Sequence, residues 1–126
     1  MDYERFPMAN IKQSMDELMT IDGALCAALV DSGSGMVLGQ IGSGVDLEVA
    51  AAGNTEVVRA KLKTMKALGL NDVIEDILIT LGRQYHIIRP LHKHEGLFVY
   101  LVLDKSKSNL ALARRKTQDV EQGLAV

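Results

Sequence analysis

The chain has 126 residues, of which 48% are hydrophobic and 24% are charged. This composition is ordinary for a globular protein, and the length predicts a single domain, residues 1–126, that buries a core without disulfides or structural metals. Its 14 basic and 16 acidic residues leave a net charge of −2, which excludes a general electrostatic attraction to nucleic acid or to anionic membranes.

The N-terminal sequence and the single cysteine bear on where in the cell the protein is found. The first ten residues, MDYERFPMAN, carry charge before any apolar stretch, and no window of the sequence is long and apolar enough to span a membrane. Cys26 lies inside an apolar run, as expected of a small buried side chain rather than a nucleophile. We therefore expect a cytoplasmic protein.

The first predicted element is a short amphipathic helix. Apolar residues recur at intervals of three and four from Met8 to Leu18, and Asn10 and Gln13 have the spacing of a capping box. Two apolar runs follow, ALCAALV and MVLGQI. They predict a strand covered on both faces and then a more exposed strand.

A glycine-rich stretch, VDSGSGMVLGQIGSG, includes the connection between these strands and raises the question of phosphate binding. It lacks the Lys and Ser/Thr of a Walker loop, and Gly33, Gly35 and Gly39 are spaced one residue too far apart for a dinucleotide-binding loop. Asp, Ser and Gly favour tight reversals, so DSGSG predicts the turn of a hairpin.

A long helix is predicted from Asp46 to Leu68, because helix formers fill this segment and no proline interrupts it. Ser43 or Asp46 is expected to cap its N-terminus. With about 100° of rotation per residue, the sector assigned to the sheet holds Leu47, Ala51, Asn54, Val58, Leu62 and Met65. A second sector holds small or β-branched residues: Val49, Gly53, Val57, Ala60, Thr64 and Ala67. The polar arc between the two sectors holds Glu48, Glu56, Arg59, Lys63 and Lys66.

The second sector predicts a self-complementary helix pair across a two-fold axis. Glycine inside a helix costs about 1 kcal/mol relative to alanine, so Gly53 indicates the close approach of another backbone. The alternative is that this sector packs on a loop of the same chain. The polar arc is then the part of the helix left to solvent. Glu56, Arg59, Lys63 and Lys66 are candidates for binding a partner protein, the alternative being a merely solvated face.

The second half of the chain predicts a three-stranded meander and a terminal helix. The apolar runs EDILITL, QYHIIRPL and LFVYLVLD are the strands. The terminal helix places on one face Leu110, Ala113, Thr117, Val120 and Leu124. The order of elements is α-β-β-α-β-β-β-α, which predicts an α+β fold with one five-stranded antiparallel sheet and helices on both of its faces.

The histidines are the candidates for metal binding and for catalysis. His92, His94 and Glu95 lie close enough to hold a metal, although a polar hairpin tip is the simpler interpretation. His86 lies in a strand, as a packed or hydrogen-bonded side chain would. Nucleophile, base and orienting group do not combine anywhere in the sequence, so we expect no enzyme, no metal and no cofactor.

Two further charged features of the sequence bear on possible partners. The acidic pairs Asp16/Glu17 and Glu75/Asp76 are expected to diverge or to lie on solvated surfaces. The basic ARRK sequence in the terminal helix is the sole feature in favour of nucleic-acid binding, and it would equally complement neighbouring acids. We therefore expect no nucleic-acid partner.

From about Ile11 to Gly123 the chain resembles members of the roadblock (roadblock/dynein light chain) family. The resemblance rests on the ordered succession IDGALCAALVDSGSGMVLGQI, AAAGNTEVVRAKLKTMKALGL, DVIEDILITLGRQYHIIRPL and GLFVYLVLDKSKSNLALARRK. It implies a profilin-like fold, with the long helix on one face of the sheet and the two terminal helices on the other. It also implies dimerisation through the long helix and through the third strands, joined edge to edge.

The resemblance further implies a non-catalytic platform for Ras-like small GTPases or for motor complexes. The expected dimer interface comprises Val49, Gly53, Val57, Ala60, Thr64, Ile77 and Ile79. Whether the second subunit is an identical copy or a paralogue stays open. The alternative function is a small-molecule sensor with a ligand between helix and sheet, against which stand the bulky side chains predicted to fill that space.

Overall fold

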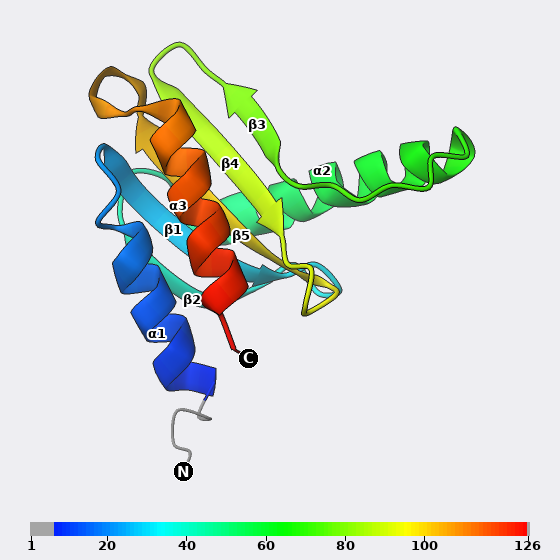
Figure 1. Ribbon diagram of the computed structural model, residues 1–126, viewed down its shortest axis with the longest axis horizontal. Helices are drawn as coiled ribbons and strands as arrows, with labels where there is room; N and C mark the ends of the chain where they lie inside the picture. The colour runs from blue at the N-terminus through cyan, green and yellow to red at the C-terminus, as the bar shows by residue number, and fades with distance from the viewer. Residues whose placement is uncertain (1–6, 126) are drawn as a thin grey trace.

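The computed structural model describes residues 7–125, with side chains from Asn10 to Ala125 (Figure 1). The elements are α1 (Pro7–Leu18), β1 (Ala24–Asp31), β2 (Met36–Gly42), α2 (Leu47–Ala67), β3 (Ile77–Thr80), β4 (Gln84–Pro90), β5 (Leu97–Asp104), the short 3-10 helix η2 (Lys105–Lys107) and α3 (Leu110–Gly123). Apart from η2, this is the predicted order of helices and strands.

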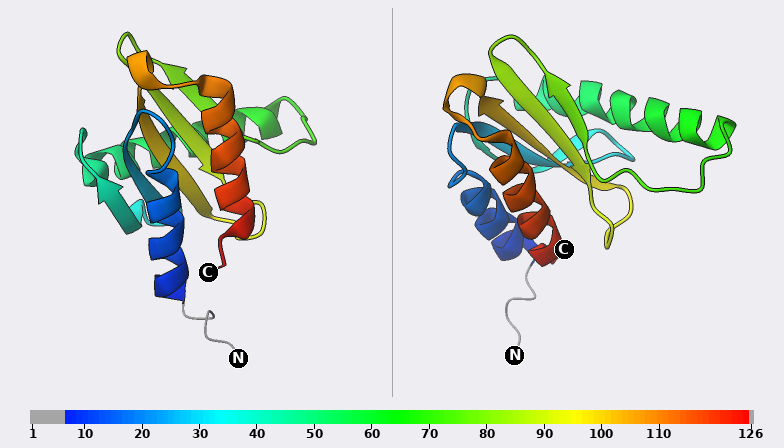
Figure 2. Two further views of the ribbon diagram at one scale, coloured as in Figure 1. Left: turned by 60° about the vertical axis from the view of Figure 1, so that its left-hand side comes forward. Right: turned by 45° about the horizontal axis from the view of Figure 1, so that its top comes forward.

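The five strands form one antiparallel sheet in the order β2-β1-β5-β4-β3. Figures 1 and 2 show α1 and α3 on one face of this sheet and α2 on the other. The last three strands are neighbours in the sheet, so the predicted meander is confirmed. The predicted α+β class and the arrangement of helices on the two faces are confirmed as well.

Each face of the sheet carries its own apolar core. On one face, Leu101 of β5 and Ile87 of β4 pack with α1 and α3. On the other face, Tyr100 and Ile88 pack with α2. The middle strands β1 and β5 are buried on both faces, whereas residues of the edge strand β2 alternate between exposed and half-buried. The expectation of one covered and one more exposed strand in the first hairpin is therefore confirmed.

The long helix begins where the sequence predicts. The Asp46 carboxylate accepts hydrogen bonds from the backbone N–H groups of Glu48 (3.1 Å) and Val49 (3.2 Å), which are left without partners in the first turn of the helix. Leu68 is the C-terminal cap, and Gly69 follows with φ +71°. α2 extends beyond the β3 edge of the sheet, so its C-terminal half projects from the body of the protein (Figure 1).

A buried ion pair fixes α3 on the sheet. Arg89 Nε of β4 lies 2.9 Å from Glu121 Oε1 of α3, and the two residues are 5% and 3% exposed. Removing either partner would leave an uncompensated charge in the core, which typically costs several kcal/mol. The pair therefore joins α3 to β4 at this position.

Three predictions about local structure were wrong. α1 begins at Pro7, so Asn10 lies inside the helix and forms no capping box with Gln13. Proline suits the first position of a helix, because its missing N–H would have no partner there. The EDILITL strand is shorter than predicted, since β3 contains four residues. Leu62 is 50% exposed instead of facing the sheet, because it belongs to the C-terminal half of α2, which extends beyond the sheet (Figure 1).

The remaining predictions for the helix faces are confirmed where the structure describes them. Ile11, Met15 and Leu18 of α1 are buried, while the side chain of Met8 lies outside the described residues. The α3 face is buried at Ala113, Thr117, Val120 and Leu124 and partly buried at Leu110.

Candidate functional site

The stripe of small residues on α2 is fully open to solvent in the described chain. Its six members are exposed: Val49, Gly53, Val57, Ala60, Thr64 and Ala67. Val49 and Val57 are 68% and 37% exposed. A Cβ built on Gly53 would have no atom of another element within 4 Å, so no backbone of this chain accounts for the glycine. Within the described residues, the segment after α2 approaches the stripe at Val57, where both line a groove, and the other five members are exposed, so no loop is packed along the stripe.

The β3 edge of the sheet lies close to α2. β3 pairs with β4 along one side, from Ile77 opposite Ile88 to Thr80 opposite Tyr85, and it is the last strand of the sheet. Ile77 and Ile79 are half-buried and face the α2 side, while Leu78 is 36% exposed on the other face. The edge therefore presents unpaired backbone groups and apolar side chains together.

An apolar groove of about 500 Å³ connects α2 with β3. It lies between the projecting half of α2 and the segment that returns to the sheet. Val57 and Met65 line it from the helix, Leu70 and Val73 line it from the returning segment, and Ile77 lines it from β3. Leu70 and Val73 are 52% and 66% exposed, which is unusual for large apolar side chains in a continuous patch.

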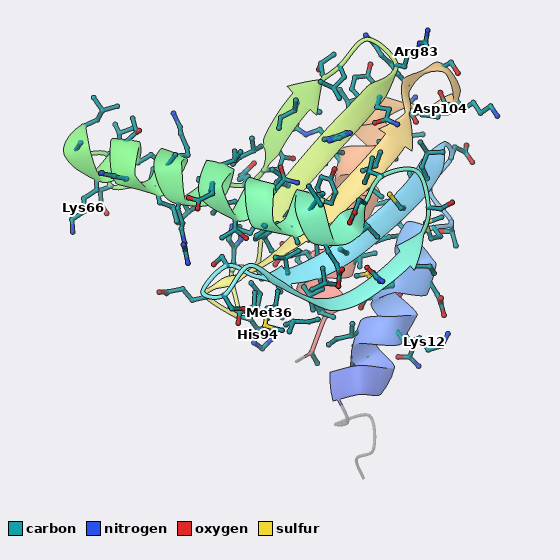
Figure 3. The ribbon with its side chains drawn as sticks, turned by 180° about the vertical axis from the view of Figure 1, so that it is seen from behind. Lys12, Met36, Lys66, Arg83, His94 and Asp104 are labelled. Carbon is teal, nitrogen blue, oxygen red and sulfur yellow. The ribbon has the colours of Figure 1, made fainter. Side chains whose placement is uncertain are left out.

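The polar arc of α2 is exposed, as predicted, but one of its members has a structural role. Glu48, Glu56, Lys63 and Lys66 lie on the solvent side of the helix, and Figure 3 shows Lys66 near its projecting end. In contrast, the Arg59 guanidinium donates hydrogen bonds to the carbonyl oxygens of Ser32 (2.7 Å) and Gly33 (2.9 Å) in the β1–β2 turn. Arg59 therefore fixes this turn against α2.

The glycine-rich stretch forms a turn, as predicted. Asp31 Oδ1 accepts the N–H of Gly33 at 2.8 Å, and Gly35 adopts φ +77°. A phosphate would need the N–H that the Asp31 carboxylate already uses, and it would lie beside that negative charge. The turn is therefore unsuited to a phosphate.

His86 belongs to a chain of polar side chains beneath α2. Its Nε2 lies 2.8 Å from Gln84 Oε1, and its Nδ1 lies 2.9 Å from the Tyr100 hydroxyl. Because the amide oxygen can only accept, Nε2 carries the proton and Nδ1 accepts from Tyr100. Asn54 of α2 also hydrogen bonds to Tyr100. The prediction of a hydrogen-bonded histidine is confirmed.

Burial shifts the pKa values of three groups in or near this core. It lowers the pKa of His86, because the charged imidazole loses hydration. It raises the pKa of Tyr100 to about 12, with the Asn54 hydrogen bond acting in the opposite direction. It also raises the pKa of the Cys26 thiol, which is fully buried and therefore poorly suited to act as a nucleophile.

The other histidines lie in the β4–β5 connection. His92 Nε2 lies 3.4 Å from the carbonyl oxygen of Ile74, and the carbonyl oxygen of His94 accepts the N–H of Leu97. Within residues the structure describes, no group of three or more His, Cys, Asp or Glu side chains is arranged to hold a metal ion. These contacts fit the interpretation as a polar hairpin tip.

The basic residues of α3 pair with acidic neighbours. Arg114 binds Asp76 through two contacts of 2.9 Å, and Lys116 lies 3.8 Å from Glu17. The Asp76 side chain is 6% exposed whereas Glu75 is exposed, so this acidic pair diverges, which is one of the two expected arrangements. The partner of Asp76 lies 38 positions away in the sequence, and no local pattern could have revealed the ion pair.

Together these features define an α+β protein with one antiparallel sheet, an exposed face of small residues on α2 and an open edge at β3. No protein-family model and no curated protein sequence matches the chain. Its structure is similar to MglB of Thermus thermophilus, a gliding protein, with a TM-score of 0.82, 19% identity, and coverage of 95% of this chain and 89% of that one. It is likewise similar to Myxococcus xanthus MglB, with a TM-score of 0.83, 18% identity, and coverage of 99% and 91%.

A Roadblock/LC7 domain from Streptomyces avermitilis also superimposes on the structure. Its TM-score is 0.76 at 12% identity, with coverage of 87% of this chain and 90% of that chain. The chain therefore has the roadblock fold, as the sequence resemblance implies. No helix in the described part of the chain has the length and apolar character needed to cross a membrane.

Proposed function

We propose that the protein is a non-catalytic homodimeric platform that binds or regulates a Ras-like small GTPase. The observation that carries the proposal is the exposed small-residue stripe of α2 beside the open β3 edge. In this proposal Val49, Gly53, Val57, Ala60, Thr64, Ile77 and Ile79 form the interface between two copies.

Both parts of this surface favour a second copy of the chain. Small side chains let two helix backbones approach closely, and a two-fold axis lets the same stripe serve both subunits. A second copy joined at β3 would extend the sheet beneath the projecting half of α2. That position would cover Leu62 and the apolar groove, which are exposed in the single chain.

The polar arc is the proposed surface for the GTPase, because a dimer would leave it open on both copies. Glu56, Lys63 and Lys66 are exposed on α2 and available to a partner. Arg59 contributes less than the sequence suggests, since its guanidinium is already bonded to the β1–β2 turn. The similarity to MglB and the family resemblance support a GTPase as the partner. A ligand between α2 and the sheet is disfavoured, because Leu47, Ala51 and Val58 are buried there.

Sedimentation tests the dimer. The wild type should sediment as a dimer at micromolar concentration, and Val57→Glu should sediment as a monomer. The new charges would face each other in a dehydrated interface, at a cost of several kcal/mol. Lys63→Glu is the matched control on the same helix and should leave the dimer intact. A monomeric wild type, or a dimeric Val57→Glu, would show that this interface is wrong.

Capture from native lysate tests the GTPase. Tagged wild-type protein should recover a partner that carries guanine nucleotide, which can be released and identified by chromatography. The platform itself should neither bind nor hydrolyse GTP. Recovery of partners without guanine nucleotide would contradict the assignment of a GTPase.

A further inference from the structure

The segment between α2 and β3 leads directly into the edge strand. Residues 70–76 have no regular secondary structure and are mostly exposed, and they include the apolar side chains of Leu70 and Val73. Among the described residues, two hydrogen-bonded contacts tie this segment to parts of the protein beyond α2. One is the 3.4 Å contact between the Ile74 carbonyl oxygen and His92, and the other is the ion pair between Asp76 and Arg114.

The ion pair is the stronger of these two contacts. Arg114 Nε lies 2.9 Å from Asp76 Oδ2, and Arg114 Nη2 lies 2.9 Å from Asp76 Oδ1. Two parallel charge-assisted hydrogen bonds of this kind fix the orientation as well as the distance of a carboxylate. The hydrogen bond and charge of Asp76 raise the pKa of Arg114.

The helix that carries Arg114 is itself firmly placed. Seven residues further along α3, Glu121 forms the buried ion pair with Arg89 of β4. Ile88, the residue before Arg89, is the partner of Ile77 in the sheet, and Ile77 directly follows Asp76. α3 therefore contributes a cation to the β3 side and an anion to the β4 side at the same end of this strand pair.

We propose that the Arg114–Asp76 pair holds the β3 edge in the position needed for pairing with a second copy, so that α3 on the far face of the sheet controls dimer affinity. The inference rests on the proposed dimer. Arg114 is a positioning residue in it, since it acts through Asp76 and β3.

The physical reason is the cost of ordering a short strand. β3 has four residues and is paired on one side, so its own contacts are few. Fixing the backbone of a single residue is entropically unfavourable, and a strand released at its start must be ordered again whenever two copies meet. We expect a weakening of dimerisation of about tenfold for each residue released.

The test compares two neighbouring arginines in the full-length protein. Arg114→Gln removes the ion pair and keeps much of the side-chain length. Arg115→Gln makes the same change at the adjacent position, where the arginine forms an exposed 3.6 Å pair with Asp119 within α3. The dimer dissociation constant, from sedimentation equilibrium, should rise about tenfold for Arg114→Gln and stay unchanged for Arg115→Gln.

Two further measurements separate positioning from a loss of fold. Amide hydrogen exchange on dilute monomer should accelerate at residues 77–80 in Arg114→Gln and keep the wild-type rate in β1 and β5. In a double-mutant cycle, Asp76→Asn together with Arg114→Gln should weaken the dimer no more than either change alone.

The outcomes separate this inference from the proposed function. A dimeric wild type with equal dissociation constants for Arg114→Gln and Arg115→Gln would overturn the inference and leave the proposed dimer standing. Additive effects in the double-mutant cycle would also overturn it. A monomeric wild type would overturn the proposed dimer, and the inference with it.

Discussion

At the scale of single residues, the hydrogen-bonded side chains around His86 on the α2 face of the sheet are expected to make folding stability depend on pH. Neutral His86 donates to Gln84 and accepts from Tyr100, which Asn54 of α2 also contacts. A proton on Nδ1 would point at the Tyr100 hydroxyl hydrogen and force the hydroxyl to turn away. Protonation of His86 would therefore break its hydrogen bond with Tyr100 and place a positive charge in a half-buried site.

The pKa shift of His86 gives the sign of the expected pH dependence. Its pKa in the folded protein is below the ordinary value of 6.5, so the unfolded chain binds the proton more tightly. The contribution to stability is present above pH 6.5 and is lost as the pH falls through the lower, folded value. The melting temperature of the wild type should fall more than that of His86→Gln between about pH 7.5 and about pH 5.5.

His92→Gln is the control, because its side chain is exposed in the β4–β5 connection and contacts the Ile74 carbonyl oxygen instead of Tyr100. It should keep the wild-type pH dependence. If His86→Gln loses as much thermal stability on acidification as the wild type, the neutral histidine does not contribute in this way.

Residues with local partners could be predicted from the sequence, whereas residues with distant partners could not. Asp46 follows from the preference of helix caps, and Gly35 follows from turn chemistry. The roles of Arg59 and Asp76 depend on contacts to segments 26 and 38 positions away. The sequence shows which residues are charged, but it does not show which of them form ion pairs in the fold.

At the scale of elements, α2 was predicted almost completely, and the exception is informative. Helical periodicity identifies sectors but contains no information on where the sheet ends beneath the helix. Leu62 lies in the predicted sheet sector and is exposed, because it belongs to the C-terminal half of α2, which extends beyond the sheet (Figure 1). Thr55 is buried although it was not assigned to the sheet, because the β1–β2 turn lies against it, where a Cβ on Gly35 would be 3.8 Å from its hydroxyl oxygen. Its hydroxyl donates to the Ala51 carbonyl oxygen within the helix. Where the sheet ends beneath the helix depends on the tertiary structure, and the periodicity of the helix alone does not reveal it.

A substitution at Gly53 is expected to have opposite effects on the single chain and on the proposed dimer. In the single chain a methyl group at this position would meet nothing within 4 Å, so Gly53→Ala should stabilise the monomer by about 1 kcal/mol through helix propensity. In a close helix pair the same methyl group would push the two backbones apart and weaken the dimer. The expected result is a higher melting temperature at low concentration together with a higher dimer dissociation constant.

Ala52→Gly, one position earlier and also exposed, is the reverse control: it should destabilise the monomer without relieving any contact in the stripe. A Gly53→Ala variant that dimerises as tightly as the wild type would show that the helices do not approach closely at Gly53.

At the scale of the whole molecule, the proposed two-fold axis would place the exposed α2 surfaces of two copies beside each other, as one larger surface. Lys63 and Lys66 are exposed in the C-terminal half of α2, and Figure 3 shows Lys66 near the projecting end of the helix. A dimer would bring two such ends into one platform on the α2 side of the extended sheet. Clustered cations of this kind speed the association of an acidic partner surface and select among partners more than they add to affinity.

Reversing these charges should therefore reduce GTPase capture without changing the dimer. Lys63→Glu combined with Lys66→Glu should lower recovery of the guanine-nucleotide-carrying partner on the order of tenfold at low salt, and less at high salt, where the field is screened. The control makes the same change of charge elsewhere, with Lys12→Glu on α1 and Lys107→Glu in η2. Both double variants should sediment as dimers, so a difference in capture reports on the α2 surface alone. Equal recovery by the two would mean that the GTPase binds another face of the dimer, and the polar arc would then be a solvated surface.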